Sequence, residues 1–154
     1  MSNNDVIKVL NDLIQTSEDG KKGFAEAEHG ATKQDLKTMF HQRSTECDAA
    51  ATELQVLVKS LGGTPEVGGT IGGAAHRGWA KVKATVGDAD IGMLEEVERA
   101  EDHAKIAYAK ALTATLPEQV RTVIQRQHDG AVKNHDAVRD LRNNYKAAKA
   151  AHVS

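Results

Sequence analysis

Four long stretches of this chain carry small and apolar residues at alternating spacings of four and three. On a helix this spacing forms a single stripe, and stripes of this kind pack as a left-handed four-helix bundle. The first stretch shows the pattern with Val6, Leu10, Leu13, Phe24 and Ala27. We therefore predict an all-α fold whose main helices cover about residues 4–29, 33–61, 89–114 and 117–148.

The lengths of the connections predict how these helices are ordered. Short turns join the first helix to the second and the third to the fourth, so each pair should be an antiparallel hairpin. The segment between the second and third helices is far longer and is rich in glycine from Gly63 to Gly73. A crossover of that length can make the second and third helices parallel, as in a ferritin-like up-down bundle. We expect a short fifth helix in it, over about residues 71–86, within one domain spanning 1–154.

Local signals predict where two of the helices begin and end. Gly30 is suited to a left-handed stop after the first helix. Thr32 can cap the second helix, with Asp35 three residues later as a weak capping box. The second helix should end at Gly62 and Gly63, which the helical pattern does not continue past.

Charge and composition argue against several classes of partner. The net charge is −2 with 27% charged residues and no basic block, which argues against nucleic-acid binding. No run approaches the roughly 18 apolar residues of a membrane span. The polar start and the single cysteine, Cys47, make a cytoplasmic protein our expectation.

Polar residues interrupt the apolar stripes near the middle of the predicted bundle. If the second and third helices are parallel, Arg43 and Glu101 stand at the same level, and Gly20 lies opposite Arg43. Folding the fourth helix back adds Gln127 and Asn134 to this polar core layer. Our first interpretation is a buried ion pair between Arg43 and Glu101, satisfied by the two amides. The alternative is a binding centre for a metal, an anion or a small polar ligand.

Candidate metal ligands also lie at or beside this layer: Glu98, Glu101, Asp102, His128 and His135. Ferritin-like di-iron centres need a Glu from each of two helices and a Glu-x-x-His pair from each of the others. No carboxylate stands three residues before either histidine, and the second helix places an arginine in the layer. The di-iron motif is therefore incomplete, and no cofactor is expected. A degenerate site for iron or manganese stays the alternative.

Several motifs resemble those of an uncharacterised bacterial family. They are Asp19-Gly20-x-x-Gly23-Phe24, the turn Gly62-Gly63-x-Pro65, His76-Arg77-Gly78-Trp79, Glu98-Arg99-x-Glu101-Asp102 and the stretch from Gln127 to His135-Asp136. On these residues the chain resembles the ferritin-like four-helix bundles of domain of unknown function 2383. The resemblance implies a ferritin-like bundle in a soluble, stress-associated bacterial protein, and it supplies no activity.

Three functional hypotheses follow from the sequence. The first is a non-enzymatic bundle with a structural polar core, acting through its surface or by self-association. The second is a metal-binding oxidoreductase or metal-storage-like protein, and the third is a helical interaction module. In the crossover, we expect Trp79 to cover the core, with His76 and Arg77 in solvent or binding an anion. A homodimer and an unidentified protein partner are left open.

Overall fold

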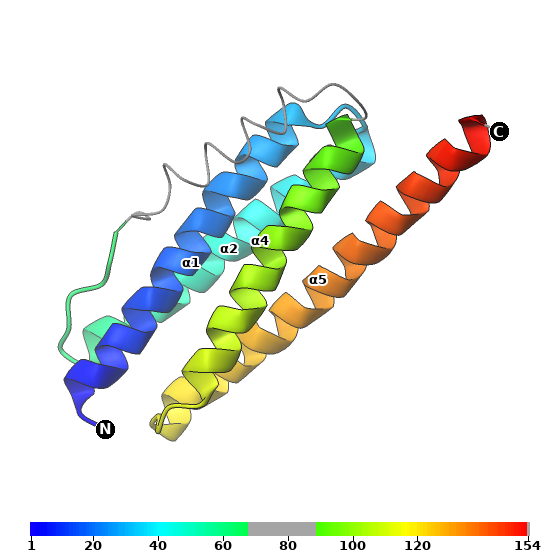
Figure 1. The fold of residues 1–154 in the computed structure, drawn as a ribbon. Coiled ribbons are helices and arrows are strands. Elements are labelled where there is room, and N and C mark those ends of the chain that lie inside the picture. Colours follow the sequence, from blue (N-terminus) through cyan, green and yellow to red (C-terminus); the bar gives the residue numbers. More distant parts are fainter. Residues whose placement is uncertain (68–88, 154) are drawn as a thin grey trace.

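The computed structural model describes residues 1–67 and 89–153, and all regular secondary structure in these two ranges is α-helical. The helices described are α1 (Asn3–Gly30), α2 (Gln34–Ser60), α4 (Ala89–Leu112) and α5 (Glu118–Val153), shown in Figure 1. The fifth helix expected over 71–86, and with it His76, Arg77 and Trp79, lies outside the described residues. None of the described helices combines the length and apolarity that a membrane span requires.

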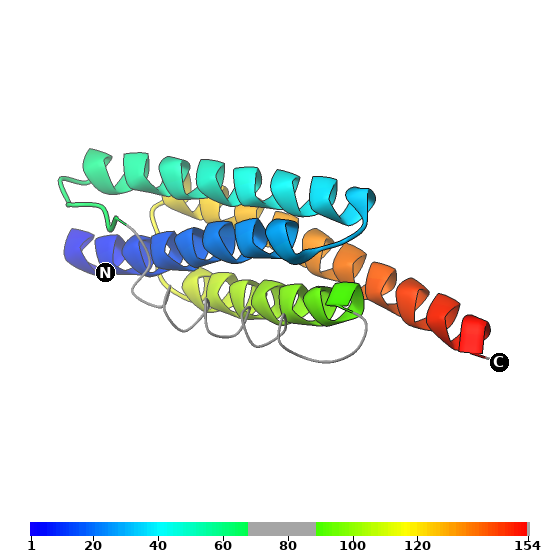
Figure 2. The same ribbon diagram turned by 90° about the horizontal axis from the view of Figure 1, so that it is seen from above.

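The helices form a bundle in which neighbours are antiparallel. Helix α1 packs against both α2 and α4, and α4 packs against α5. Figure 1 shows α2 and α4 running in the same direction, and Figure 2 shows them on opposite sides of the bundle with α1 and α5 between them. The predicted all-α bundle is confirmed, with its second and third main helices parallel.

Two apolar clusters hold the helices together, one toward each end of the bundle. The first includes the fully buried side chains of Leu10, Ile14, Leu54, Val58 and Ile124. The second includes those of Leu36, Phe40, Met93, Leu94 and Val97. Burial of each such side chain stabilises the fold by about 1.5–3 kcal/mol. The bundle is thus secured at both ends, and the layer between the clusters is free to be polar.

The corner between α1 and α2 differs from the prediction. Gly30 is the last residue of α1, and Ala31 ends the helix in an extended conformation. Thr32 does not cap α2, because its amide and hydroxyl donate to the carboxylate of Asp90 at 2.8 and 2.6 Å. The cap position is Lys33, which makes no side-chain hydrogen bond there. Asp90 is buried on α4 and needs donors, so it attaches the corner to the third main helix.

The C-terminal ends of α2 and α5 follow from local chemistry. Gly62 has a φ of 81°, in the left-handed region that glycine adopts without strain, and it ends α2 as predicted. Helix α5 continues to Val153, beyond the expected end near residue 148. Alanine has the highest helix propensity, and the last turns of α5 contain Ala147, Ala148, Ala150 and Ala151. In Figures 1 and 2 this final part of α5 projects past the rest of the bundle.

Candidate functional site

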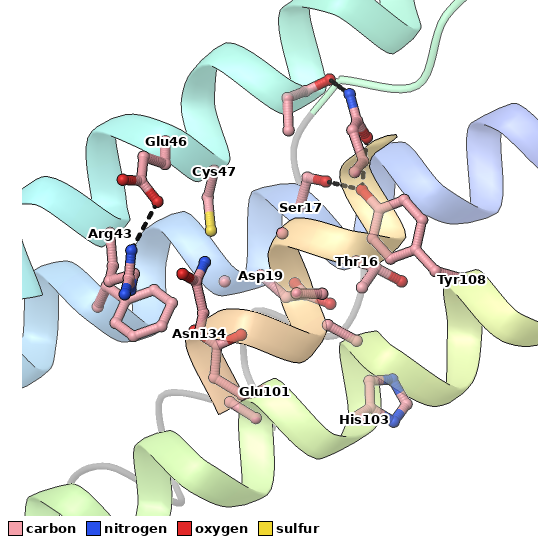
Figure 3. A pocket seen from close by; sticks show the side chains of 18 of the residues that line it. Thr16, Ser17, Asp19, Arg43, Glu46, Cys47, Glu101, His103, Tyr108 and Asn134 are labelled. Carbon is pink, nitrogen blue, oxygen red and sulfur yellow. Dashed lines mark hydrogen bonds and ion pairs between the residues drawn. The ribbon is translucent and has the colours of Figure 1, made fainter. Parts of the chain in front are cut away.

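A cavity of about 750 Å³ lies in the middle of the bundle, between the two apolar clusters (Figure 3). All four described helices contribute to its lining. Small residues leave the room for it: Gly20, Ala50, Ala104, Gly130 and Ala131. All four residues of the predicted polar core layer, Arg43, Glu101, Gln127 and Asn134, line this cavity.

Glu101 is the most deeply buried charged side chain of the cavity. Its exposed fraction is 6%, and its carboxyl makes no hydrogen bond or ion pair with any described residue. Burial raises the pKa of Glu101 to about 7, and the nearby Arg43 opposes this rise only in part. In Figure 3 the side chains of Glu101 and Asn134 point into the same part of the cavity. A carboxyl that is partly ionised at neutral pH is therefore held there without a partner among the described residues.

The predicted ion pair between Arg43 and Glu101 is wrong. Arg43 pairs instead with Glu46 on its own helix, with Nη1 and Oε2 2.9 Å apart. Figure 2 shows α2 and α4 on opposite sides of the bundle, and they are not among the helix pairs that pack directly against each other. Glu46 is one turn from Arg43 on the same helix, so its carboxylate is nearer to the guanidinium than the carboxylate of Glu101 is. The Nε of Arg43 is buried in the cavity wall, and no acceptor for it lies within residues 1–67 and 89–153.

The α1 wall places a second carboxylate at the cavity. The Oδ1 of Asp19 is buried and has no hydrogen-bond partner in the described part of the chain. Burial raises the pKa of Asp19, with Lys22 and His103 acting in the opposite direction. The prediction placed the neighbouring Gly20 opposite Arg43. In the structure Gly20 faces Cys47, which lies one turn further along α2. A Cβ on Gly20 would lie 3.0 Å from the Cys47 Sγ, so the missing side chain permits close approach of α1 and α2.

A chain of hydrogen bonds crosses the bundle at the other side of the cavity. The Tyr108 hydroxyl donates to Gln127 Oε1 at 2.6 Å and lies 3.3 Å from Ser17 Oγ. Gln127 Nε2 donates in turn to Glu53 Oε1 at 2.8 Å. The chain joins all four described helices, and burial raises the pKa of Tyr108 to about 12. Tyr108 is not among the residues predicted for the polar layer, although a tyrosine in an apolar stripe needs a partner for its hydroxyl.

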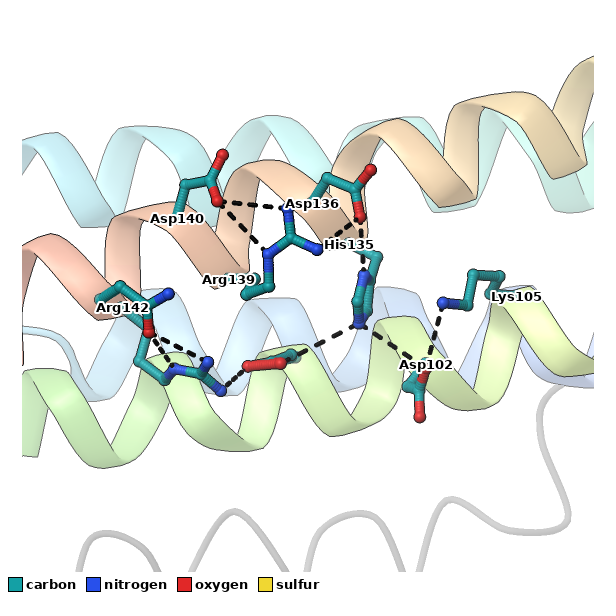
Figure 4. A network of polar contacts seen from close by, with 9 residues as sticks. Asp102, Lys105, His135, Asp136, Arg139, Asp140 and Arg142 are labelled. Atoms are coloured by element: carbon teal, nitrogen blue, oxygen red, sulfur yellow. Dashed lines mark hydrogen bonds and ion pairs between the residues drawn. The ribbon is translucent and has the colours of Figure 1, made fainter.

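The candidate metal ligands do not converge on one centre. Glu101 faces the cavity, whereas His135 lies between α4 and α5 with Glu98 and Asp102 (Figure 4). His135 Nε2 is 3.6 Å from Asp102 Oδ1 and 4.0 Å from Glu98 Oε1. His128 is apart from both, 3.4 Å from Asp129. Within residues 1–67 and 89–153, no group of three or more His, Cys, Asp or Glu could hold a metal ion.

Basic side chains of the protein form ion pairs with the carboxylates around His135. Glu98 pairs with Arg142 of α5, and Asp102 pairs with Lys105 at 3.4 Å. We call Glu98, Asp102, Lys105, His135 and Arg142 the α4–α5 charge network. Its carboxylates have protein partners, so nothing in its geometry requires an added ion.

Over the residues that the structure describes, the fold and the site together define a four-helix bundle whose central cavity has mostly apolar walls and a few polar groups. A model of the family described as a domain of unknown function (DUF2383) matches residues 5–114, and the chain belongs to this family. The matched region covers α1 from Asp5 onward and all of α2 and α4, whereas α5 lies beyond it. None of the curated proteins compared with the chain matches it.

Proposed function

We propose that the protein binds a small polar organic molecule in the cavity between its two apolar clusters. The observation that carries this proposal is Glu101, which is buried against a cavity of about 750 Å³ with no partner among the described residues. A purely structural polar layer satisfies its own hydrogen-bonding groups. Here no described residue satisfies the Glu101 carboxyl or the Arg43 Nε.

The size and lining of the cavity suit such a ligand. Sites for small molecules have volumes of about 300–1,000 Å³ and combine apolar walls with a few polar groups. The walls here include Phe24, Ala50, Ala100 and Ala104, and the polar groups come from each helix. Binding of this kind needs no chemical step. We therefore propose a binding protein rather than an enzyme, and the motif resemblance extends this to a stress-associated protein of the bacterial cytoplasm.

We place the entrance between α2 and α5, which are joined mainly by side chains. Arg126 pairs with Glu53, and Gln127 Nε2 donates to the Ala50 carbonyl at 3.4 Å. Gly130 of α5 lines the cavity, and a Cβ built on it would meet no atom within 4 Å. A large side chain at Gly130 should therefore block the cavity without disturbing the helix.

A fragment screen followed by NMR of the ¹⁵N-labelled protein tests the proposal. We expect small polar fragments to shift the amide resonances around Ser17, Glu101 and Tyr108, and Gly130→Trp to abolish these shifts. Ala137→Trp is the matched control, because Ala137 lies two turns further along α5 and is exposed. Fragments that leave the cavity resonances unmoved, or that bind Gly130→Trp equally well, would contradict the proposal.

Iron or manganese is the alternative occupant of the bundle. Plasma mass spectrometry of protein produced in medium supplemented with each metal separates the two proposals. We expect well below one metal ion per chain. A stoichiometric metal that is lost in Glu101→Ala and His135→Ala would replace the organic ligand with a metal centre.

A further inference from the structure

The charges that line the cavity do not balance. Its lining contains three arginines, and each is paired with a carboxylate that also lines it. The pairs are Arg43 with Glu46, Arg99 with Glu96, and Arg126 with Glu53. The arginines are therefore already compensated by their own partners.

Two further carboxylates of the lining have no such partner. Neither Asp19 nor Glu101 forms an ion pair or hydrogen bond through its side chain with a described residue. His103 also lines the cavity, and it lowers the pKa of Asp19 without forming an ion pair with it. The described lining of the cavity thus has an excess of negative charge at two places, Asp19 and Glu101, and Glu101 is the more buried of them.

We infer that the ligand is an organic cation, an amine or a guanidinium compound, whose positive group lies against Glu101. This inference rests on the proposed function, because it concerns the ligand of the same cavity. Asp19 supplies a second acceptor on the α1 wall, and a hydrogen-bond acceptor on the ligand can satisfy the Arg43 Nε. An anionic ligand would instead have to enter a cavity whose arginines are already neutralised.

The physical reason for selectivity is the environment of Glu101. Water screens charges weakly in a buried site, so a cation there is attracted far more strongly than at the surface. The same burial is unfavourable for the carboxylate alone, and a bound cation removes that cost by holding Glu101 in its ionised form. A neutral molecule of equal shape gains neither effect.

Three molecules of similar shape and different charge test the inference: 2-phenylethylamine, 2-phenylethanol and phenylacetate. Titration of each into the full chain, followed by NMR, gives a dissociation constant and the location of the shifts. We expect the amine to bind at least tenfold more tightly than the alcohol or the carboxylate. Glu101→Gln should lose this preference while the alcohol binds as before. Asp102→Asn is the matched control, because it removes the adjacent carboxylate of α4, which faces the α4–α5 charge network.

The outcomes separate the two proposals. If the alcohol or the carboxylate binds in the cavity as tightly as the amine, the cation inference is wrong and the proposed function stands. An amine preference that survives in Glu101→Gln also overturns the inference. If no probe shifts the cavity resonances, both proposals fail. Stoichiometric Mn²⁺ binding that is lost in Glu101→Gln would show that the cation is a metal ion.

Discussion

The cavity and the α4–α5 charge network use the same kinds of residue in opposite ways. Glu98 and Glu101 lie one turn apart on α4, yet Glu98 points toward α5 and pairs with Arg142. Glu101 instead points into the cavity, where no described residue pairs with it. In the network each carboxylate is neutralised by the protein, and the result is structural. In the cavity no described residue neutralises the carboxylate of Glu101. The free energy of its ionised form therefore depends on what the cavity contains.

The largest expected effect concerns how strongly the cavity excludes water. Burial raises the pKa of Cys47 from 9.0 to about 12, and the carboxylates of Glu101 and Glu46 add to the rise. The reactive thiolate should therefore be about a thousandfold scarcer than in the unfolded chain. We expect iodoacetamide to label Cys47 about a thousandfold more slowly in the native protein than in urea. Labelling within tenfold of the unfolded rate would show that the cavity is as wet as the surface.

Replacing Glu101 tests whether its charge destabilises the folded protein in the absence of ligand. Its pKa is about 7 in the folded protein against 4.5 for the ordinary group, so its ionisation opposes folding. The favourable contribution of Glu101 is fully present below about pH 4.5 and is lost as the pH rises through 7. Glu101→Gln should therefore stabilise the free protein at about pH 8 by up to about 3 kcal/mol.

Urea unfolding of the wild type and Glu101→Gln between about pH 5 and pH 8 measures this effect. Arg43 and Glu46 face Glu101 from α2, and they are unchanged in both proteins. We expect the difference between the two proteins to grow with pH. If Glu101→Gln instead destabilises the protein by a few kcal/mol at pH 8, that result would support an ion pair between Arg43 and Glu101.

The same substitution in the α4–α5 charge network should have the opposite sign. Glu98→Gln leaves the partly buried Arg142 without its carboxylate and removes an acceptor near His135. We expect a loss of about 1–2 kcal/mol in the free energy of unfolding at neutral pH. Thermal unfolding with the double variant Glu98→Gln/Arg142→Met as control measures it. Stabilisation by Glu98→Gln would remove the distinction between the two regions.

The smallest expected effect compares two glycines of the cavity lining, Gly130 and Gly20. Gly130 is inside α5, where alanine is favoured over glycine by about 0.5–1 kcal/mol, and a Cβ there would meet no atom within 4 Å. Gly130→Ala should therefore stabilise the protein by about that amount. At Gly20, where the Cys47 Sγ would be 3.0 Å away, the same change should bring no such gain. Equal gains at both positions would show that the helices separate more easily than the structure indicates.

The bundle could be predicted from the sequence because its causes are local or periodic. The spacing of Leu10, Leu54 and Val97 sets which face of each helix is buried, and Gly62 ends α2 by its own conformational freedom. The corner at Thr32 could not be predicted, because its partner Asp90 is 58 residues away in sequence. A capping signal is weak when a buried charge elsewhere needs the same donors.

The candidate site could be predicted only in part. The level of Arg43, Glu101, Gln127 and Asn134 along the bundle follows from helix length and topology, and all four line the cavity. Their pairing depends on which helices are neighbours and which lie on the diagonal, and the stripes do not contain that information. An error of about one turn placed Gly20 opposite Arg43 rather than Cys47.

The pKa of Glu101 tests most directly whether this buried carboxyl lacks a partner, as it does within residues 1–67 and 89–153. A ¹³C-NMR titration of the side-chain carboxyl groups gives that pKa, with Glu101→Gln to assign the resonance. We expect a pKa of about 7 for Glu101 in the ligand-free protein. A value at or below the ordinary 4.5 would mean that Glu101 is paired or solvated, and the cavity would then need no ligand.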